Sequence, residues 1–134
     1  MASIRQARRR RGLVVVEAAI IMNLLLLVVL GVLEYGWMFL VSDEMHNAAR
    51  QGARLAVLPD ATEDQVKSAV ETLLTNSRLQ GTTHTVTITP SDPMGVTPGN
   101  NVKVEVTLTY VPLTHFVPTP PTLRASVIMA KEGP

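Results

Sequence analysis

RRRRGLVVVEAAIIMNLLLLVVLGVLEYGWMFLV, residues 8–41, is the stretch that determines the fold of this chain. After the arginines and one glycine it is apolar almost throughout, and polar side chains interrupt it at Glu17, Asn23 and Glu34. A helix over residues 13–41 would be about 40 Å long, whereas crossing a bilayer core takes only ~20 apolar residues. Because a backbone in lipid must satisfy its own hydrogen bonds, we predict a single transmembrane helix over residues 13–41.

The arginines predict the direction of insertion. Positive residues beside a span stay in the cytoplasm, and four of them precede the apolar run: Arg8, Arg9, Arg10 and Arg11. We therefore expect a cytoplasmic leader over residues 1–12, too densely charged to fold, and an extracytoplasmic domain over residues 42–134. A secretory signal peptide has the same order of basic and apolar segments, but its apolar part is shorter and ends at a small-residue cleavage site, a pattern that this sequence lacks.

Glu17 stands near the start of the apolar run, where a charged side chain costs at least ~2.5–3.5 kcal/mol on insertion scales. One interpretation places it near the membrane surface, within reach of headgroups and water. The other takes the bond between Gly12 and Leu13 as a cleavage site, which would leave a new amino group on Leu13. The Glu17 carboxylate of a neighbouring subunit would then pair with that amine and offset the cost of burying either charge.

This arrangement resembles the type IV pilin class, in which a short basic leader ending in Gly is removed and Glu becomes the fifth residue of the mature chain. Here Gly12 is followed by Leu-Val-Val-Val and then Glu17. A second stretch, LEYGWMFLVSDEMHNAARQGARLAVLPDAT (residues 33–62), is similar to the TadE-type minor pilins, or pseudopilins, of the tight-adherence (Flp) pilus systems. The resemblance covers most of the chain and is sharpest over residues 12–58. The chain lacks the Cys pair that many other type IV pilins carry.

The resemblance implies a precursor in the bacterial inner membrane that a prepilin peptidase cuts after Gly12. The mature subunit would then join or prime an adhesive pilus, with major and other minor pilins, the inner-membrane assembly platform and membrane lipid as partners. Glu17 would set the register between subunits. A permanent single-span scaffold or binding protein of the envelope, which keeps its anchor, is the alternative. An enzyme accessory domain on a membrane stalk is a third hypothesis, for which the sequence offers no site.

Side chains farther along the helix are candidate contacts with other subunits. Asn23 lies deep in the span, where an amide commonly hydrogen-bonds to another helix. Glu34 is followed by Tyr35, Trp37 and Phe39. Because aromatic residues gather at the membrane–water boundary, we expect Glu34 either at the outer interface or at a subunit contact.

The helix is expected to continue beyond the span for a total of roughly 45 residues, with Gly31 and Gly36 as the places for a bend, and to end before the first proline. Past residue 42, small apolar residues recur at spacings of three and four, which predicts a face that another backbone can approach closely. Gly52 lies in this face and is a candidate subunit contact. Arg50 and Arg54 lie one turn apart on another face. They are either a solvated pair or partners for acidic groups of an adjacent subunit or for headgroups.

The rest of the chain predicts an α+β fold. Residues 62–77 indicate a second helix, with Thr62 and Gln65 as a capping box and one apolar face. Three β-branched, alternating segments indicate strands at residues 83–89, 102–111 and 123–129. A proline-rich loop over residues 112–121 separates the last two strands. Because about three strands with one apolar face need a cover, we expect the second helix and the distal part of the long helix to pack on a small antiparallel sheet.

Charge and composition exclude several functions. Five of the 12 basic residues precede Gly12, which leaves seven basic against 11 acidic residues, so a nucleic-acid-binding surface is not expected on the folded domain. The chain has no cysteine and therefore no disulfide or thiol chemistry. His46, His84 and His115 fall in three different predicted elements and form no ligand set. We expect no metal, no cofactor and no catalytic constellation, and predict that the protein is not an enzyme.

Overall fold

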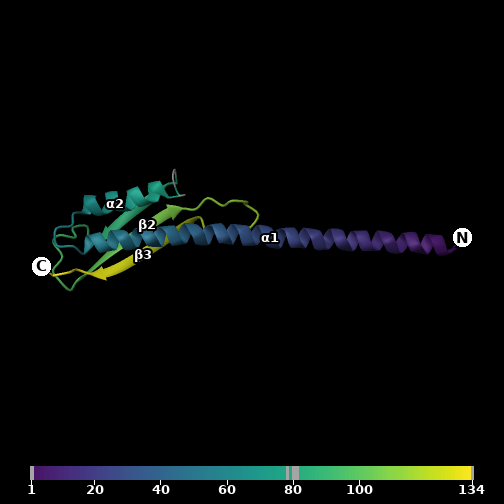
Figure 1. Ribbon diagram of the computed structural model, residues 1–134, viewed down its shortest axis with the longest axis horizontal. Helices are drawn as coiled ribbons and strands as arrows, with labels where there is room; N and C mark the ends of the chain where they lie inside the picture. The colour runs from purple at the N-terminus through teal and green to yellow at the C-terminus, as the bar shows by residue number, and fades with distance from the viewer. Residues whose placement is uncertain (1, 78, 80–81, 134) are drawn as a thin grey trace.

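The computed structural model describes residues 2–77, 79 and 82–133, with side chains from residue 14 onward. Two helices precede three strands in the chain. In Figure 1 the second helix and the strands gather around one end of the first helix, whose other half projects alone toward the N-terminus. The predicted α+β architecture with a long N-terminal helix is confirmed.

Helix α1 (Ala2–Ala56) is one continuous helix of 55 residues, about 80 Å long at 1.5 Å per residue. Gly31 and Gly36 lie inside it, and Figure 1 shows no break along the rod. The helix is longer than expected because the leader, predicted to be unfolded, is helical from Ala2. Alanine, arginine and glutamine make up most of that segment, and they are among the strongest helix formers.

Helix α2 (Glu63–Asn76) begins as its sequence predicts. Thr62 is the N-cap, and its side chain accepts a hydrogen bond from the Gln65 backbone N–H at 3.4 Å. The Gln65 side chain accepts the Thr62 backbone N–H at 3.2 Å, which completes the capping box. The helix buries three side chains of its apolar face: Val66, Val70 and Leu74.

Three antiparallel strands form a single sheet in the order β1-β2-β3. Strand β1 is His84–Thr89, β2 is Asn101–Thr109 and β3 is Thr122–Ala130. The central pairing places Val106 opposite Val86 on β1 and opposite Ala125 on β3. All three predicted strands are confirmed, because the alternation of apolar and polar residues matches the two faces of a pleated sheet.

The apolar face of the sheet packs against both helices. Gly52 lies where they come closest, since a Cβ built on it would be 2.5 Å from Val70 Cγ2 on α2 and 3.2 Å from Val104 Cγ1 on β2. Small or flexible residues on the same face of α1 are buried beside it: Met45, Ala48, Ala49, Ala53 and Ala56. The small-residue face of α1 therefore packs against α2 and the sheet of its own chain. Gly52, a candidate subunit contact on sequence grounds, is buried within the domain.

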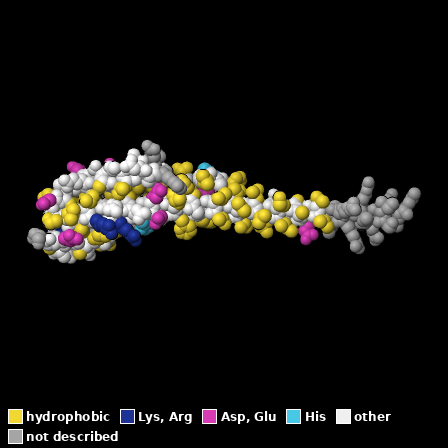
Figure 2. Space-filling view, viewed as in Figure 1, with side chains coloured by type: hydrophobic (Ala, Val, Ile, Leu, Met, Phe, Trp, Pro, Cys, Tyr) yellow, Lys and Arg dark blue, Asp and Glu magenta, His cyan; other side chains and the backbone are white. Residues whose placement is uncertain are grey.

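The two described halves of α1 differ in what surrounds them. The large apolar side chains of residues 14–29 are all exposed, and Figure 2 shows apolar side chains along the projecting rod. From Glu34 onward, one face of the helix is buried by the domain. Among the described residues, α1 is the helix that is long and apolar enough to cross a membrane, and none of its most apolar window is buried. Its length and composition suggest a membrane anchor.

Candidate functional site: two carboxylates on one helix

Glu17 lies in the projecting half of α1 and is exposed. No ion pair to its carboxylate is present among the residues whose side chains are described. The bond between Gly12 and Leu13 lies in the same helix, one turn and a fraction before Glu17. The side chains of Leu13 and of the four leader arginines fall outside the described part of the structure. Glu17 is therefore exposed and has no ionic partner among the described side chains.

Asn23 is also exposed on the projecting half. It follows Glu17 by six residues, which in a helix of 3.6 residues per turn places the two side chains about 120° apart. The carboxylate and the amide therefore face different directions. In a bundle of helices the two side chains would contact two different neighbouring helices.

Glu34 has the opposite environment, because its side chain is 0 % exposed. Oε1 accepts hydrogen bonds from the Tyr110 hydroxyl at 2.9 Å and from the Leu113 N–H at 3.0 Å. Oε2 accepts from the Thr114 N–H at 2.7 Å and from the Thr114 hydroxyl at 2.8 Å. We call this set the Glu34 clamp. Both carboxylate oxygens are occupied by the chain's own donors, so Glu34 is buried inside the domain.

The clamp joins parts of the chain that lie 76 to 80 residues apart in sequence. It ties α1 to the end of β2 and to the segment that follows, residues 110–121, which we call the β2–β3 loop. Burial, and then the hydrogen bond and charge of Glu34, raise the pKa of Tyr110 to about 12. Sequence reasoning missed all three partners, and the only sequence signal for them is that Tyr110 continues the apolar alternation of β2.

Lys131 makes a second long-range contact at the other end of the domain. It is buried, and its Nζ donates to the Leu58 carbonyl at 2.5 Å and to the Ala56 carbonyl at 3.4 Å. These carbonyls belong to the end of α1 and the turn after it, where helical partners run out and cations are favoured. The backbone nearby is also tied, because the Glu132 N–H donates to the Val57 carbonyl at 3.1 Å.

Arg50 and Arg54 are both exposed on α1, one turn apart. Neither takes part in an ion pair among the described side chains. The structure thus keeps them on the outside of the covered half of α1, while Gly52 between them faces inward. Whether they contact a second subunit stays a prediction.

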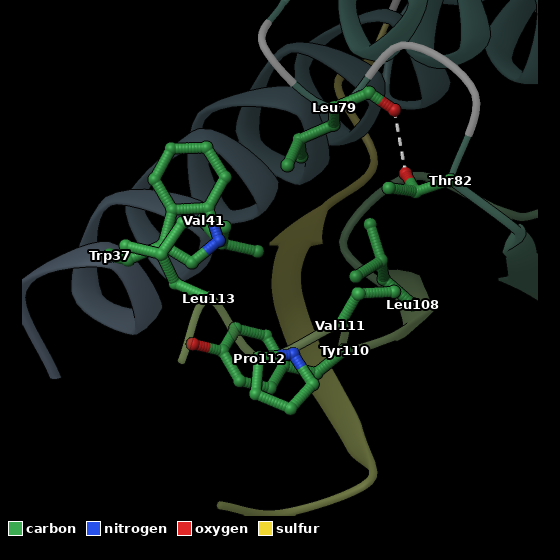
Figure 3. A pocket seen from close by; sticks show the side chains of 9 residues that line it. All are labelled: Trp37, Val41, Leu79, Thr82, Leu108, Tyr110, Val111, Pro112 and Leu113. Carbon is green, nitrogen blue, oxygen red and sulfur yellow. Dashed lines mark hydrogen bonds between the residues drawn. The ribbon is translucent and has the colours of Figure 1, made fainter. Parts of the chain in front are cut away.

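An apolar pocket of about 250 Å³ lies next to the Glu34 clamp. Figure 3 shows Trp37 and Val41 of α1 on one side of it and the end of β2 with the start of the β2–β3 loop on the other. Its one hydroxyl-bearing aliphatic side chain, Thr82, donates to the Leu79 carbonyl at 2.6 Å. No charged residue lines this pocket. Its apolar side chains lie between the start of the β2–β3 loop and α1.

Histidines and carboxylates are scattered over the domain. Within the described residues, no group of three or more His, Asp or Glu side chains could hold a metal ion. His46 Nδ1 lies 2.8 Å from the Ser42 carbonyl in its own helix, and His84 Nδ1 lies 3.1 Å from the Thr82 carbonyl. Each ring is therefore engaged locally.

Residues 12–54 match the family model described as "TadE: TadE-like protein". Over this segment, about a third of its length, the chain is similar to TadE-like proteins. The match starts at Gly12, contains both carboxylates, and stops two residues before α1 ends. No curated protein and no solved structure matches the chain.

The extent of the match divides the chain into two parts. The matched segment is nearly all of α1 after the leader, including every candidate contact from Glu17 to Arg54. The partners that bury Glu34, and Lys131 at the other end, lie outside it. The likeness over this segment suggests a protein associated with a tight-adherence pilus. The domain that covers half of α1 must be understood from its own contacts.

Proposed function

We propose that this protein is a TadE-like minor pilin, or pseudopilin, of a tight-adherence pilus. Its precursor is anchored in the bacterial inner membrane with the leader in the cytoplasm and the domain on the other side. A prepilin peptidase cuts after Gly12, and the mature chain joins or primes a pilus that serves surface adhesion. The observation that carries the proposal is the projecting half of α1, apolar on all sides with the carboxylate of Glu17 near its start.

A helix that is apolar on all sides suits a subunit that moves from lipid into a bundle of other helices. A helix that lay on the membrane surface would be apolar on one face only. Residues 14–29 expose large apolar side chains in every direction, so they can be surrounded by lipid first and by the helices of major and minor pilins afterwards. The assembly platform of the inner membrane would drive that exchange.

Pairing between Glu17 of one subunit and the new amino group on Leu13 of its neighbour sets the axial register of the helices in such a bundle. In an apolar bundle an unpaired carboxylate is costly, so staggers that leave Glu17 without a partner are rejected. A stagger that brings it to the Leu13 amine of a neighbour is favoured. The subunit performs no catalysis in this proposal.

The test is the mass of the N-terminal peptide of the protein, isolated from cells with and without the prepilin peptidase. We expect a chain that begins at Leu13 only where the peptidase is present. A Gly12→Val variant should keep the leader in both strains. The matched control is Gly31→Val, a site where an added Cβ meets nothing within 4 Å, and it should be processed normally.

An uncut leader in both strains would contradict the proposal. The protein would then be a permanent single-span scaffold or binding protein of the envelope, which keeps its arginines and has no use for a free amine on Leu13. Cleavage at another bond would leave a pilin-like subunit but remove the pairing argued for Glu17.

A further inference from the structure

The β2–β3 loop lies beside α1 at the point where the helix becomes covered. Its Leu113 and Thr114 N–H groups donate to Glu34, and Figure 1 shows the loop leaving β2 and running along α1 toward the projecting half. Its sequence, YVPLTHFVPTPP, contains no Asp, Glu, Lys or Arg. The loop is therefore an uncharged segment fastened next to an apolar rod.

The loop exposes large apolar side chains instead of burying them. Phe116 is 79 % exposed, the highest value for a large hydrophobic residue in the described part of the chain, and Val111 and Leu113 are also exposed. On α1, Tyr35 and Phe39 are exposed within five residues of Glu34, the residue to which the loop is bonded. Exposed apolar residues gathered in one place mark an interaction surface.

The length of the projecting half sets the level of this surface relative to a bilayer. Residues 14–33 cover about 30 Å at 1.5 Å per residue, which equals the thickness of a hydrocarbon core. A span over these residues puts Glu34, and the loop fastened to it, at the boundary between hydrocarbon and headgroups. Aromatic side chains such as Phe39 and Phe116 are then beside the lipid and not in open water.

We propose that the β2–β3 loop is a second membrane contact, which places Phe116 and Leu113 in the bilayer surface beside α1 while the Glu34 clamp holds the loop at that depth. The lipid surface is favoured over a second protein as the occupant because the patch is continuous with the membrane-spanning half of α1 and carries no charge. This proposal needs only that α1 spans a bilayer. It does not depend on cleavage after Gly12 or on pilus assembly.

The absence of cysteine from the chain allows a direct test. Phe116→Cys and Ile128→Cys each give a single thiol on the full, unprocessed protein, reconstituted in phosphatidylcholine–phosphatidylglycerol vesicles and labelled with a nitroxide. Ile128 is the matched control, because it is 60 % exposed and lies toward the end of β3, on the face opposite the buried Ala125 and the partly buried Val127. We expect the label at position 116 to be several-fold more accessible to oxygen than to a water-soluble nickel chelate, and the label at 128 to show the reverse.

Equal accessibility at the two positions would overturn the proposal. The same measurement at decreasing protein-to-lipid ratio identifies the occupant: a lipid contact does not change with dilution. Protection at position 116 that disappears on dilution would instead assign the loop to a contact with a second copy.

The role of the clamp is tested in the same vesicles by adding Glu34→Gln to Phe116→Cys. Gln keeps the size of the side chain but presents an NH₂ group where Oε2 accepts two donors from Thr114. We expect the label to become more mobile and shallower, while Glu17→Gln, the matched change on the projecting half, leaves it unchanged. An unchanged label in the Glu34→Gln protein would show that the clamp does not position the loop.

Discussion

The two halves of α1 have the same backbone and opposite surroundings. Residues 14–33 project with nearly all of their large apolar side chains exposed, whereas residues 34–56 have one face buried by α2, the sheet and the β2–β3 loop. The sequence changes with the surroundings: bulky aliphatic residues fill the first half, and small ones line the buried face of the second. A long helix can thus leave one part of its surface to be completed by lipid or other chains and complete another part itself.

The two carboxylates show the same difference at the level of single side chains. Glu34 receives two donors on each oxygen from its own domain. Glu17 is exposed and has no ion pair among the described side chains. A charge whose partners come from the same chain contributes to folding, while a charge whose partner must come from elsewhere contributes to assembly. The following predictions test that division.

The largest effect is expected for Glu17→Ala. The variant should insert and be cut normally but enter pili at a level reduced by about tenfold or more, because the Leu13 amine of a neighbour is left without its counter-charge. Its domain should unfold at the wild-type temperature. The measurement is the subunit content of sheared pili against that of membranes. Normal incorporation would show that Glu17 does not set the register.

Glu34→Ala should do the reverse and weaken the fold. Four donor groups of the β2–β3 loop, the Tyr110 hydroxyl among them, lose their acceptor. We expect the domain to unfold at a temperature lower by on the order of 10 °C. Trp37, the single tryptophan, lines the pocket beside the clamp and reports the transition by fluorescence in mild detergent. An unfolding temperature equal to that of Glu17→Ala would erase the difference between the two carboxylates.

Substituting two glycines of the covered half separates its buried face from its open one. Gly52→Ala should destabilise the domain by about 1–3 kcal/mol, since the new Cβ lies 2.5 Å from Val70 Cγ2, and the overlap exceeds the gain in helix propensity. Gly36→Ala meets nothing within 4 Å and should be neutral or stabilising by up to about 1 kcal/mol. Denaturant titration of both variants is the test. A stable Gly52→Ala protein would mean that α1 and α2 can separate slightly at no cost.

A smaller effect concerns the ionisation of Tyr110. Its pKa is raised to about 12, above that of a free tyrosine. The stabilisation is therefore complete below the pKa of tyrosine in the unfolded chain, and it is lost as the pH rises from that pKa to the raised pKa of the folded protein. In a Tyr35→Phe background, which leaves Tyr110 as the one tyrosine, absorbance near the phenolate band should follow this titration. Adding Glu34→Gln should lower the midpoint only partly, because burial remains. A midpoint that Glu34→Gln does not move would remove the carboxylate from the explanation.

The smallest effect belongs to a third carboxylate, Glu105, on the outward face of β2. Lys103 Nζ lies 2.5 Å from it and Arg124 at 4.0 Å, and the hydrogen bond from Lys103 holds the pKa of Glu105 below its usual value. Its stabilisation is therefore complete above the ordinary Glu range and is lost as pH falls through the lowered pKa. We expect about 0.2–1 kcal/mol, as for other exposed pairs. Glu105→Gln should abolish this part of the acid dependence in denaturant titrations, and an unaltered acid limb would assign it to other groups.

Local patterns in the sequence predict much of this fold. The capping box of Thr62 and Gln65, the alternation in β2 and the length of the apolar run each depend on residues within a few positions, so they can be recognised without the structure. The Glu34 clamp cannot, because its partners are 76 to 80 residues away and two of them are backbone N–H groups, which every residue except proline has. Hydropathy places the end of the span at residue 41, which stays a prediction, while contacts of the domain reach back to Glu34.

The small-residue face of α1 is a second case in which the sequence predicts a contact but not its partner. Periodicity predicts that a backbone approaches near Gly52, and the structure confirms a close approach. It does not reveal which backbone, since small residues suit a neighbouring subunit and the chain's own α2 equally well. Only the complete packing of the sheet and α2 settles that choice.

Glu34 and Lys131 fasten the domain to α1 at two places about 33 Å apart along the helix. A mechanical load applied to the projecting half, from whatever source, reaches the domain at the Glu34 end first and runs parallel to the helix axis. The hydrogen bonds at the two fastenings and the packing between them are then loaded together, in shear, instead of being pulled off one after another. The domain is thus attached in the way that best withstands being dragged lengthwise by its stem.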